Sequence, residues 1–280
     1  MLESFESISP TAILTSYPRT FTDIPYEKEI FKWLSKNCNE NVKLNKLLAP
    51  EIEARYKLTD KIMSKLNIKQ VLELAAGYSS RGLIYSEKDY NYVEMDLDIV
   101  TKNKEKMINE IFKINNNLHL VSGNALIYED YTKCEKFFET GKEIAVINEG
   151  LLRYLTWEEK TIVAQNIYKF LKQHGGVWIT CDITPKRFIQ KQNIQNPTLN
   201  NNINSLTSRN DLNDRFEDEN HIREFFEKIG FKNVEIHKFI EVKDELKSFE
   251  LLNMNKNECD ELLESALVGV IRIDWCIKIV

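Results

Sequence analysis

The stretch QVLELAAGYSSRGL, residues 70–83, determines how the rest of the chain is interpreted. It opens with an apolar run that suits a buried strand and is too short for a helix, namely Val71, Leu72 and Leu74. Small residues follow at 75–77, where they let a ligand approach the backbone, and Gly77 can adopt a positive φ. Ligands of open α/β sheets bind at the carboxyl ends of central strands. We therefore predict a ligand-binding loop after this strand.

Glu73 stands inside the apolar run, where a carboxylate is costly to bury without a partner. Two interpretations are open. Glu73 is held internally, as a helix cap or in an ion pair with Arg81, or it faces a cationic or hydroxyl-rich cofactor. A G-x-G-x-x-G fingerprint would need glycines where Ala75 and Ser80 stand, so the motif typical of nicotinamide-binding proteins is absent.

Residues 73–81, ELAAGYSSR, resemble the E-x-G-A-G-x-x-T-R loop of S-adenosylmethionine (SAM)-dependent methyltransferases. More narrowly, these residues resemble the leucine carboxyl methyltransferase and polyketide O-methyltransferase family. Ala75 stands in place of the family's first glycine. It implies an α/β fold: a Rossmann-like, seven-stranded class I methyltransferase sheet with an N-terminal helical cap. It also implies SAM as cofactor, with cofactor contacts from the loop residues Glu73, Ala75, Gly77 and Arg81.

Composition limits the alternatives. The 280 residues, 42% hydrophobic with a net charge of -5, suit one large domain or one domain with an appended cap. No basic stripe is present, which argues against a nucleic-acid partner. Five scattered cysteines without a C-x-x-C indicate a reducing compartment and no zinc site. No apolar run reaches the ~20 residues of a membrane span, and no signal peptide is visible, so we expect a cytoplasmic protein.

Residues 1–66 are expected to form the helical cap, and residues 67–280 the methyltransferase domain. Asp23 can cap a helix with Pro25 in its first turn, and a second helix follows Pro50 up to Leu66. In the family, this region covers the cofactor pocket. Arg55 aligns with a family arginine that holds the cofactor's carboxylate; the alternative is a solvated arginine on an amphipathic helix.

The second and third strands bring further candidates. Asp96 ends YVEMD, 19 residues after Gly77, where an acid suits hydrogen bonds to ribose hydroxyls. The segment resembles the family's Y-x-E-x-D, which makes Asp96 the ribose ligand with Glu94 beside it; the alternative is that Asp96 caps the next helix. After the third strand, Asn124 and Ala125 occupy the adenine position. The family usually has an aspartate at 124, and asparagine still offers an acceptor oxygen.

The fourth strand, residues 144–147, runs into EGLLRYLTWEE, which resembles the family's E-G-x-L-x-Y-L-s-x-E-E. The resemblance implies that Glu149 faces the cofactor's ammonium and the transfer site. The motif T-x-x-E at 156–159 predicts a capping box. Arg19, Arg153 and Tyr154 are the candidates for gripping an acidic substrate in the catalytic site, although each also suits an ion pair or core packing.

The last third of the chain should complete the sheet. We expect a fifth strand at 177–180, a helix ending at Gly230, a strand at 234–240, a helix at 258–265 and a final strand at 270–279. Residues 186–218 are rich in asparagine and poor in large apolar residues, which predicts a mobile loop. It is either a lid over the substrate side or an insertion without a role.

The chemistry follows from the cofactor. Methyl transfer needs alignment and exclusion of water, and a carboxylate of pKa ~4 is already ionised at neutral pH, so no general base is required. No clustered metal ligands follow the fourth strand. We expect a SAM-dependent O-methyltransferase acting on a carboxylate (or hydroxyl) oxygen of an acidic small molecule. The alternatives are methylation of a protein carboxyl terminus and a non-catalytic SAM-binding or scaffold protein.

Overall fold

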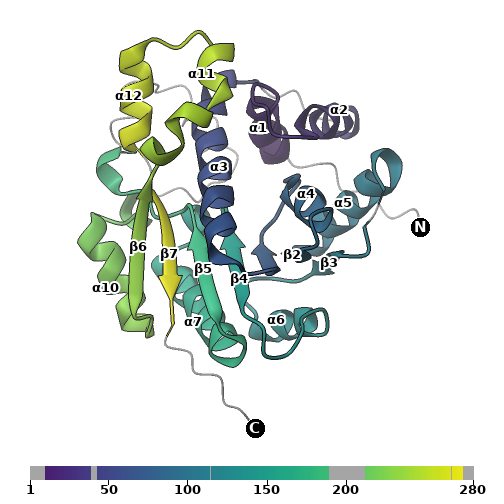
Figure 1. Ribbon diagram of the computed structural model, residues 1–280, viewed down its shortest axis with the longest axis vertical. Coiled ribbons are helices and arrows are strands. Elements are labelled where there is room, and N and C mark those ends of the chain that lie inside the picture. The colour runs from purple at the N-terminus through teal and green to yellow at the C-terminus, as the bar shows by residue number, and fades with distance from the viewer. Residues whose placement is uncertain (1–9, 39–42, 114, 189–211, 266, 274–280) are drawn as a thin grey trace.

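Short apolar segments build one seven-stranded sheet in the computed structural model, which describes residues 10–38, 43–113, 115–188, 212–265 and 267–273 (Figure 1). The strands are β1 Gln70–Leu74, β2 Asn91–Asp96, β3 Leu118–Ser122, β4 Ile144–Asn148, β5 Gly176–Thr180, β6 Asn233–Lys238 and β7 Leu267–Arg272. Their order is β3-β2-β1-β4-β5-β7-β6, and β7 runs antiparallel to both of its neighbours. The predicted α/β class and seven-stranded Rossmann-like sheet are confirmed.

Strands β1 to β5 are parallel, and strand order reverses at β1. From β1 the chain moves outward through β2 and β3, then returns to place β4 on the other side, in register Leu74↔Asn148. The sheet therefore has a topological switch point between β1 and β4, where ligands of such folds bind.

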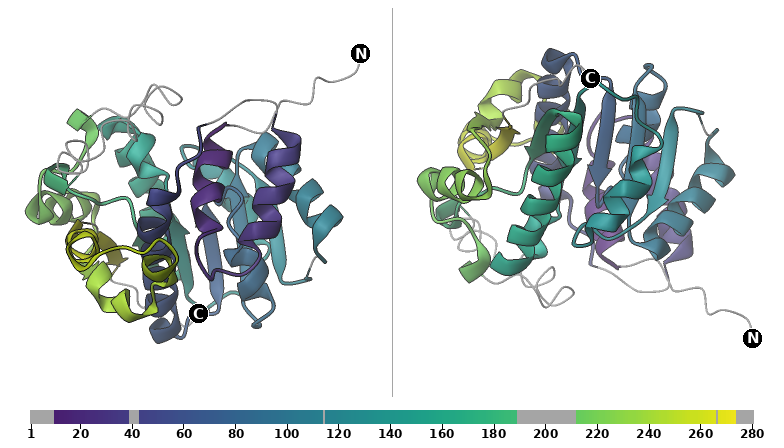
Figure 2. Two further views of the ribbon diagram at one scale, coloured as in Figure 1. Left: turned by 90° about the horizontal axis from the view of Figure 1, so that it is seen from above. Right: turned by 90° about the horizontal axis from the view of Figure 1, so that it is seen from below.

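Helices cover both faces of the sheet, as the views from above and below show (Figure 2). The helices are α1 Pro10–Arg19, α2 Glu27–Asn37, α3 Ala49–Leu66, α4 Arg81–Ser86, α5 Asp98–Ile111, α6 Tyr128–Glu135, α7 Trp157–His174, α10 Glu219–Ile229, α11 Lys247–Leu251 and α12 Lys256–Ser265. Short 3-10 turns are η1 Lys46–Leu48, η2 Leu152–Tyr154, η3 Leu212–Asp214 and η4 Phe239–Glu245.

Strand residues alternate between two apolar clusters because successive side chains point to opposite faces. Val71 and Ala145 join the cluster that contains α2 and α3, whereas Leu72 and Val146 join the one that contains α7 and α10. Helix α3 thus packs directly on the sheet and shares its core. The division into a cap at 1–66 and a domain at 67–280 stays a prediction.

Several expected boundaries were wrong. Helix α2 begins at Glu27 because Tyr26 takes a left-handed backbone with φ 70°, and Asp23 pairs with Lys57 at 2.5 Å instead of capping the helix. Strand β6 ends at Lys238, since Phe239 turns inward as the first residue of η4 and is fully buried.

Other elements differ from the expectation or lie partly outside the described residues. The final strand starts at Leu267, three residues before the expected position, and its expected part at 274–279 lies outside the described residues. Helices α4 and α6 lie between the first five strands, where helices were expected without bounds, and the short helix α11 was not anticipated. Residues 189–211 of the expected lid also lie outside the described part, so the lid stays a prediction.

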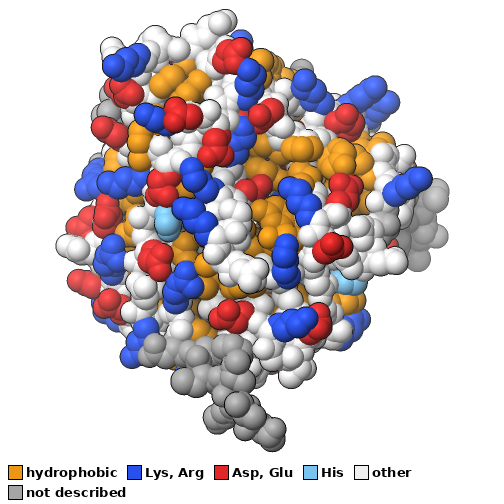
Figure 3. Space-filling view, viewed as in Figure 1, with side chains coloured by type: hydrophobic (Ala, Val, Ile, Leu, Met, Phe, Trp, Pro, Cys, Tyr) orange, Lys and Arg blue, Asp and Glu red, His pale blue; other side chains and the backbone are white. Residues whose placement is uncertain are grey.

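Among the described helices, none is both long and apolar enough to cross a membrane. On the face seen in Figure 3, basic and acidic side chains are interspersed.

Candidate active site

The loop after β1 is shaped by two residues with left-handed backbone. Ala75 has φ 52° and Gly77 has φ 53°. The Ala75 N–H donates to the Met95 carbonyl at 2.8 Å, which ties the loop to β2. A Cβ placed on Gly77 would meet no atom within 4 Å, so the loop opens onto free space. This is the open backbone that the sequence predicted at the carboxyl end of β1.

Asp96 lies beside this loop at the end of β2. Its Oδ2 accepts the Gly77 N–H and its Oδ1 accepts the Leu97 N–H, both at 2.7 Å. Burial raises the pKa of the Asp96 carboxyl, against these two hydrogen bonds, which lower it. Helix α5 begins at Asp98 after Leu97 and has no side-chain cap, which argues against the alternative of a helix-capping Asp96.

The loop after β4 faces the same switch point. Gly150 has φ 85°, and a Cβ there would also meet no atom within 4 Å. The carboxylate of Asp182, which follows β5, holds this loop: it accepts the N–H groups of Gly150 at 3.0 Å, Leu151 at 2.7 Å and Leu152 at 2.9 Å. The Asn148 side chain donates a fourth bond at 2.7 Å. Sequence reasoning missed Asp182, although an acid near the carboxyl end of a buried strand is the signal that identified Asp96.

Arg81 connects the end of β1 with the loop after β4. It is fully buried, and its guanidinium donates to Glu73 at 3.0 Å, Glu149 at 3.2 Å and Asp60 at 3.2 Å. Its planar group also lies 4.3 Å from the ring centroid of Tyr56. One guanidinium thus connects β1, the start of the β4 loop and α3, and it is surrounded by three carboxylates.

Glu73 is held internally, as the ion-pair interpretation proposed. It is 2% exposed, one oxygen accepts from Arg81, and the other accepts from the Tyr92 hydroxyl at 2.8 Å. A cofactor contact by Glu73 or Arg81 has no support in this geometry, and both residues support the loops from beneath.

Glu94 is likewise buried, away from the open side of the loop. It pairs with Lys104 at 2.5 Å and lies against Gly82 of α4, where a Cβ would overlap its carboxylate. Burial raises the pKa of Glu94 to about 7, although Lys104 opposes this shift. Glu94 is therefore placed under α4, and a contact with ribose has no support in this geometry.

Arg55 of α3 lies near the β4 loop. Its guanidinium pairs with Glu51, and its Nε is buried without a hydrogen-bond acceptor among the described residues. Burial lowers the pKa of Arg55, but the carboxylates of Glu51, Glu149 and Asp182 outweigh this effect and raise it overall. A buried donor without an acceptor is costly, so Arg55 is suited to an incoming anion.

Asn124 and Ala125 form the turn after β3. The Asn124 side-chain oxygen accepts the Leu126 N–H at 3.0 Å, while its backbone N–H donates to Asp130 at 2.7 Å. The Ala125 carbonyl accepts from the Tyr131 hydroxyl at 3.0 Å. The asparagine oxygen is thus used to shape its own turn, which the sequence did not anticipate.

The three predicted substrate-gripping residues are not all brought together. Arg153 and Tyr154 share η2, with the Arg153 guanidinium 5.7 Å from the tyrosine ring centroid. Arg19 ends α1 and lies 3.7 Å from Glu27, whose carboxylate accepts the Ser80 hydroxyl at 2.8 Å. Arg19 therefore belongs to the contact between the N-terminal helices and the β1 loop.

Arg215, which no sequence pattern indicated, is also buried, at 6% exposure. Burial and the Arg153 charge lower the pKa of Arg215 to about 10.

None of the four histidines donates to or accepts from the residues of these loops. His174 lies 3.4 Å from Glu135, His237 pairs with Glu241, His119 stacks on Phe137, and His221 accepts the Glu217 N–H. The described residues contain no group of three or more His, Cys, Asp or Glu side chains that could hold a metal ion.

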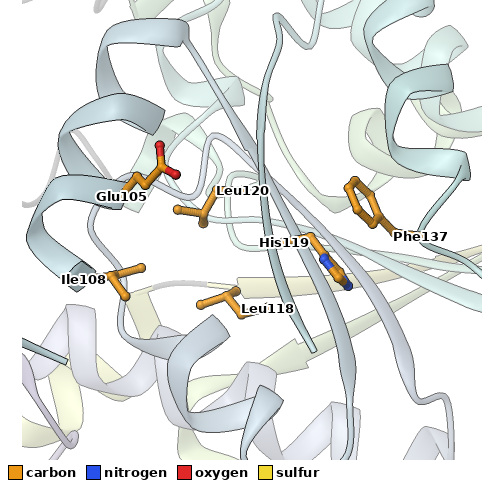
Figure 4. A pocket seen from close by; sticks show the side chains of 6 residues that line it. All are labelled: Glu105, Ile108, Leu118, His119, Leu120 and Phe137. Atoms are coloured by element: carbon orange, nitrogen blue, oxygen red, sulfur yellow. The ribbon is translucent and has the colours of Figure 1, made fainter. Parts of the chain in front are cut away.

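A separate pocket of about 220 Å³ lies at the β3 edge (Figure 4). Its lining comes from α5, β3 and the segment after α6: Glu105, Ile108, Leu118, His119, Leu120 and Phe137. None of these residues belongs to the loops after β1 and β4.

The sheet order and the loops at its switch point define a class I methyltransferase fold, and solved structures share it. A DUF574-family protein from Streptomyces avermitilis is similar with a TM-score of 0.60 at 12% identity, over 92% of this chain and 96% of that one. The methyltransferase domain of bacterial CtHen1 has a TM-score of 0.53 at 12% identity, over 79% of this chain and 98% of that one. Human N-acetylserotonin methyltransferase, in complex with SAM, has a TM-score of 0.50 at 11% identity, over 81% of this chain and 53% of that one. At sequence identities of 11–12%, this structural similarity establishes the fold.

No protein-family model matches the sequence, and no curated protein does.

Proposed function

We propose that this protein is a SAM-dependent O-methyltransferase that esterifies a carboxylate of an acidic small molecule. The observation that carries the proposal is Asp96, held by the Gly77 N–H beside an open loop at the switch point of the sheet. Acids at the end of the second strand hold ribose hydroxyls in nucleotide-binding sheets of this kind. The human neighbour was solved with SAM bound.

The residues present fit the cofactor. Gly77 leaves room for it at the backbone, and Asp96 would accept from its ribose hydroxyls. The orphaned Nε of Arg55 would donate to its carboxylate, as the family resemblance implies. Its ammonium would meet Glu149, in a group of three carboxylates that holds one guanidinium.

Bound SAM would supply an electrophilic methyl group on a positively charged sulfur. The protein's own residues then align the acceptor and exclude water, which is the main requirement for such a displacement. The loops contain no histidine that could act as a base, and a carboxylate acceptor needs none because it is ionised at neutral pH. Within the described part of the chain, Cys38, Cys134, Cys181 and Cys259 form no disulfide, which suits the reducing cytoplasm in which we place the enzyme.

The test is methyl transfer from SAM labelled with tritium in the methyl group, using a cell lysate separated into small-molecule and protein fractions. We expect label in the small-molecule fraction and its release as methanol in mild alkali, because the product is an ester. An alkali-stable product would contradict carboxylate methylation. Label confined to protein would favour the carboxyl-terminal alternative, and SAM binding without transfer would favour a non-catalytic role.

A further inference from the structure

The two edge strands of the sheet, β3 and β6, differ in their charge. Strand β6 carries Glu235, His237 and Lys238, and charged side chains on an edge strand discourage pairing with another chain. Strand β3, with the sequence LHLVS, carries no Lys, Arg, Asp, Glu or Pro. Burial and the Lys136 charge lower the pKa of its one histidine, His119, so β3 is neutral at neutral pH. The β3 edge therefore lacks the protection that the β6 edge has.

The backbone of β3 presents polar groups on the side away from β2. On the inner side, the Gly123 N–H donates to the Asp96 carbonyl of β2 at 2.8 Å. The backbone groups of successive strand residues point to opposite sides, so those of Leu118, Leu120 and Ser122 point outward. Within the described ranges, the outward N–H and carbonyl of Leu120 have no hydrogen-bond partner. We call these outward groups and their side chains the outer edge of β3.

The pocket at β3 lies over this outer edge. Its lining includes both faces of the strand, with Leu118 and Leu120 on one face and His119 on the other. Ile108 of α5 lies on the side of the two leucines, and Phe137 lies on the other side, where its ring stacks on His119 with centroids 4.1 Å apart (Figure 4). Because β2 occupies the inner edge, a pocket that touches both faces of β3 extends around its outer edge. The outward backbone groups are thus bordered by mostly apolar side chains.

We propose that the outer edge of β3 binds a second copy of this chain, through antiparallel pairing of the two β3 strands about a two-fold axis at Leu120. The inference rests on the sheet edge alone and does not depend on the proposed function.

The outward backbone groups are complementary to those of a second β3 that runs in the opposite direction. In a hydrogen-bonded antiparallel pair, two residues exchange both of their N–H···O=C bonds. With Leu120 opposite Leu120 of the second copy, each N–H reaches the other carbonyl. Each Ser122 N–H then reaches the Leu118 carbonyl of the other copy. The Leu118 N–H already donates to the Asn115 carbonyl at 3.0 Å and needs no partner in the second copy.

The side chains are compatible with the same register. It places Leu120 opposite Leu120 on one face and His119 opposite Val121 on the other, so no like charges face each other. Both Leu120 side chains, which are half-buried, would gain apolar contact at the axis. A two-fold contact of this kind closes on itself, so the assembly stops at a dimer.

Sedimentation equilibrium tests the assembly from about 1 μM to about 100 μM, the range in which a dimer with micromolar Kd forms. We expect the mass of the wild type to approach twice the 32.9 kDa of one chain. Leu120→Lys should stay monomeric, because two ammonium groups would meet at the axis. The control Ile236→Lys changes a half-buried residue of the other edge strand and should still dimerise. A monomeric wild type, or a dimeric Leu120→Lys, would overturn the proposal.

A mixture of Leu120→Lys and Leu120→Glu tests the register. Each variant repels a second copy of itself, whereas the mixture places an ammonium opposite a carboxylate. We expect each variant alone to be monomeric and the equimolar mixture to form a dimer. A mixture that stays monomeric would contradict a two-fold axis at Leu120.

Leu120→Cys covers the case in which the charged variants do not fold. Paired residues of this kind have Cα atoms about 5.5 Å apart, a separation that a disulfide can span. Mild oxidation should therefore cross-link Leu120→Cys into a dimer, but not the wild type with its own cysteines or the control Ile236→Cys. Absence of the cross-link in Leu120→Cys, or equal cross-linking in the control, would overturn the proposal.

Discussion

Ala75 carries a side chain in a backbone conformation that favours glycine. Its φ of 52° places it in the left-handed region, where a Cβ crowds the following carbonyl. The loop keeps this shape because the Ala75 N–H bonds to Met95 and the next residues turn onto Asp96. A glycine at this position would adopt the same backbone without the strain, so its effect should be on stability more than on loop geometry.

We predict that Ala75→Gly stabilises the protein by about 0.5–1 kcal/mol, because relief of the left-handed strain exceeds the added chain entropy of glycine. Urea denaturation measures the change. Ala76→Gly is the matched control: Ala76 is buried and its φ is not positive, so that variant should lose stability. A loss of stability in Ala75→Gly equal to that of the control would contradict the account.

Glu94 is a buried acid whose proton affinity depends on folding. Burial raises its pKa from 4.5 to about 7, against the attraction of Lys104. Between these two values the folded protein binds more protons at this site than the unfolded chain does. Stability contributed by Glu94 is therefore present below pH 4.5 and is lost as the pH rises through about 7.

Glu94→Gln should remove this dependence, since glutamine does not titrate and has nearly the same shape. We expect the stability of the wild type relative to the variant to fall by on the order of 1–3 kcal/mol between pH 4.5 and pH 7.5. Urea midpoints of both proteins across that range measure it, and the other buried acids cancel in the difference. Parallel pH profiles for the two proteins would show that Glu94 stays ionised beside Lys104.

At the scale of elements, the loop from Gly150 to Leu152 depends on one carboxylate in the neighbouring strand connection. Asp182 accepts three backbone N–H groups and the Asn148 amide, so it organises the approach to η2. Because η2 carries Arg153 and Tyr154, Asp182 also positions the candidate substrate contacts. Its effect on function is indirect, through the loop.

Asp182→Asn should loosen this loop, because an amide NH₂ at the Oδ2 position would face three donors. We expect a loss of about 3 kcal/mol in unfolding free energy. Hydrogen exchange of the Gly150, Leu151 and Leu152 amides should accelerate. The control Asp214→Asn affects an acid that accepts one backbone N–H, from Trp157, and should change little in this loop. Unchanged exchange in Asp182→Asn would mean that another contact holds the loop.

The elements were predictable where one local signal decides them. Short strand patterns predicted all seven strands, the last from alternating apolar residues, and the Thr156–Glu159 capping box marked the start of α7 as observed. Other boundaries depend on tertiary contacts: η4 interrupts β6 because Phe239 packs against the cluster that contains α3. Sequence periodicity alone therefore does not predict where β6 ends.

At the scale of the molecule, buried charges join the N-terminal helices to the loops at the carboxyl ends of β1 and β4. Glu27 accepts from Ser80, and Arg81 links α3 to both loops. Gly77, Asp96 and Glu149 could be located from the sequence because each lies at the end of a predicted strand or within a few residues after it. The supporting role of Arg81 and the burial of Arg215 could not be predicted, because they depend on contacts between segments that are far apart in the chain.

The most direct test of the central claim is calorimetric titration with SAM of the wild type, Asp96→Ala and the control Asp260→Ala, an exposed acid of α12. We expect the wild type and the control to bind equally, and Asp96→Ala to bind about tenfold to a hundredfold more weakly while melting cooperatively, because the ribose loses its acceptor. Equal affinity in Asp96→Ala, or no binding by the wild type, would contradict a SAM site at the carboxyl ends of β1 and β2.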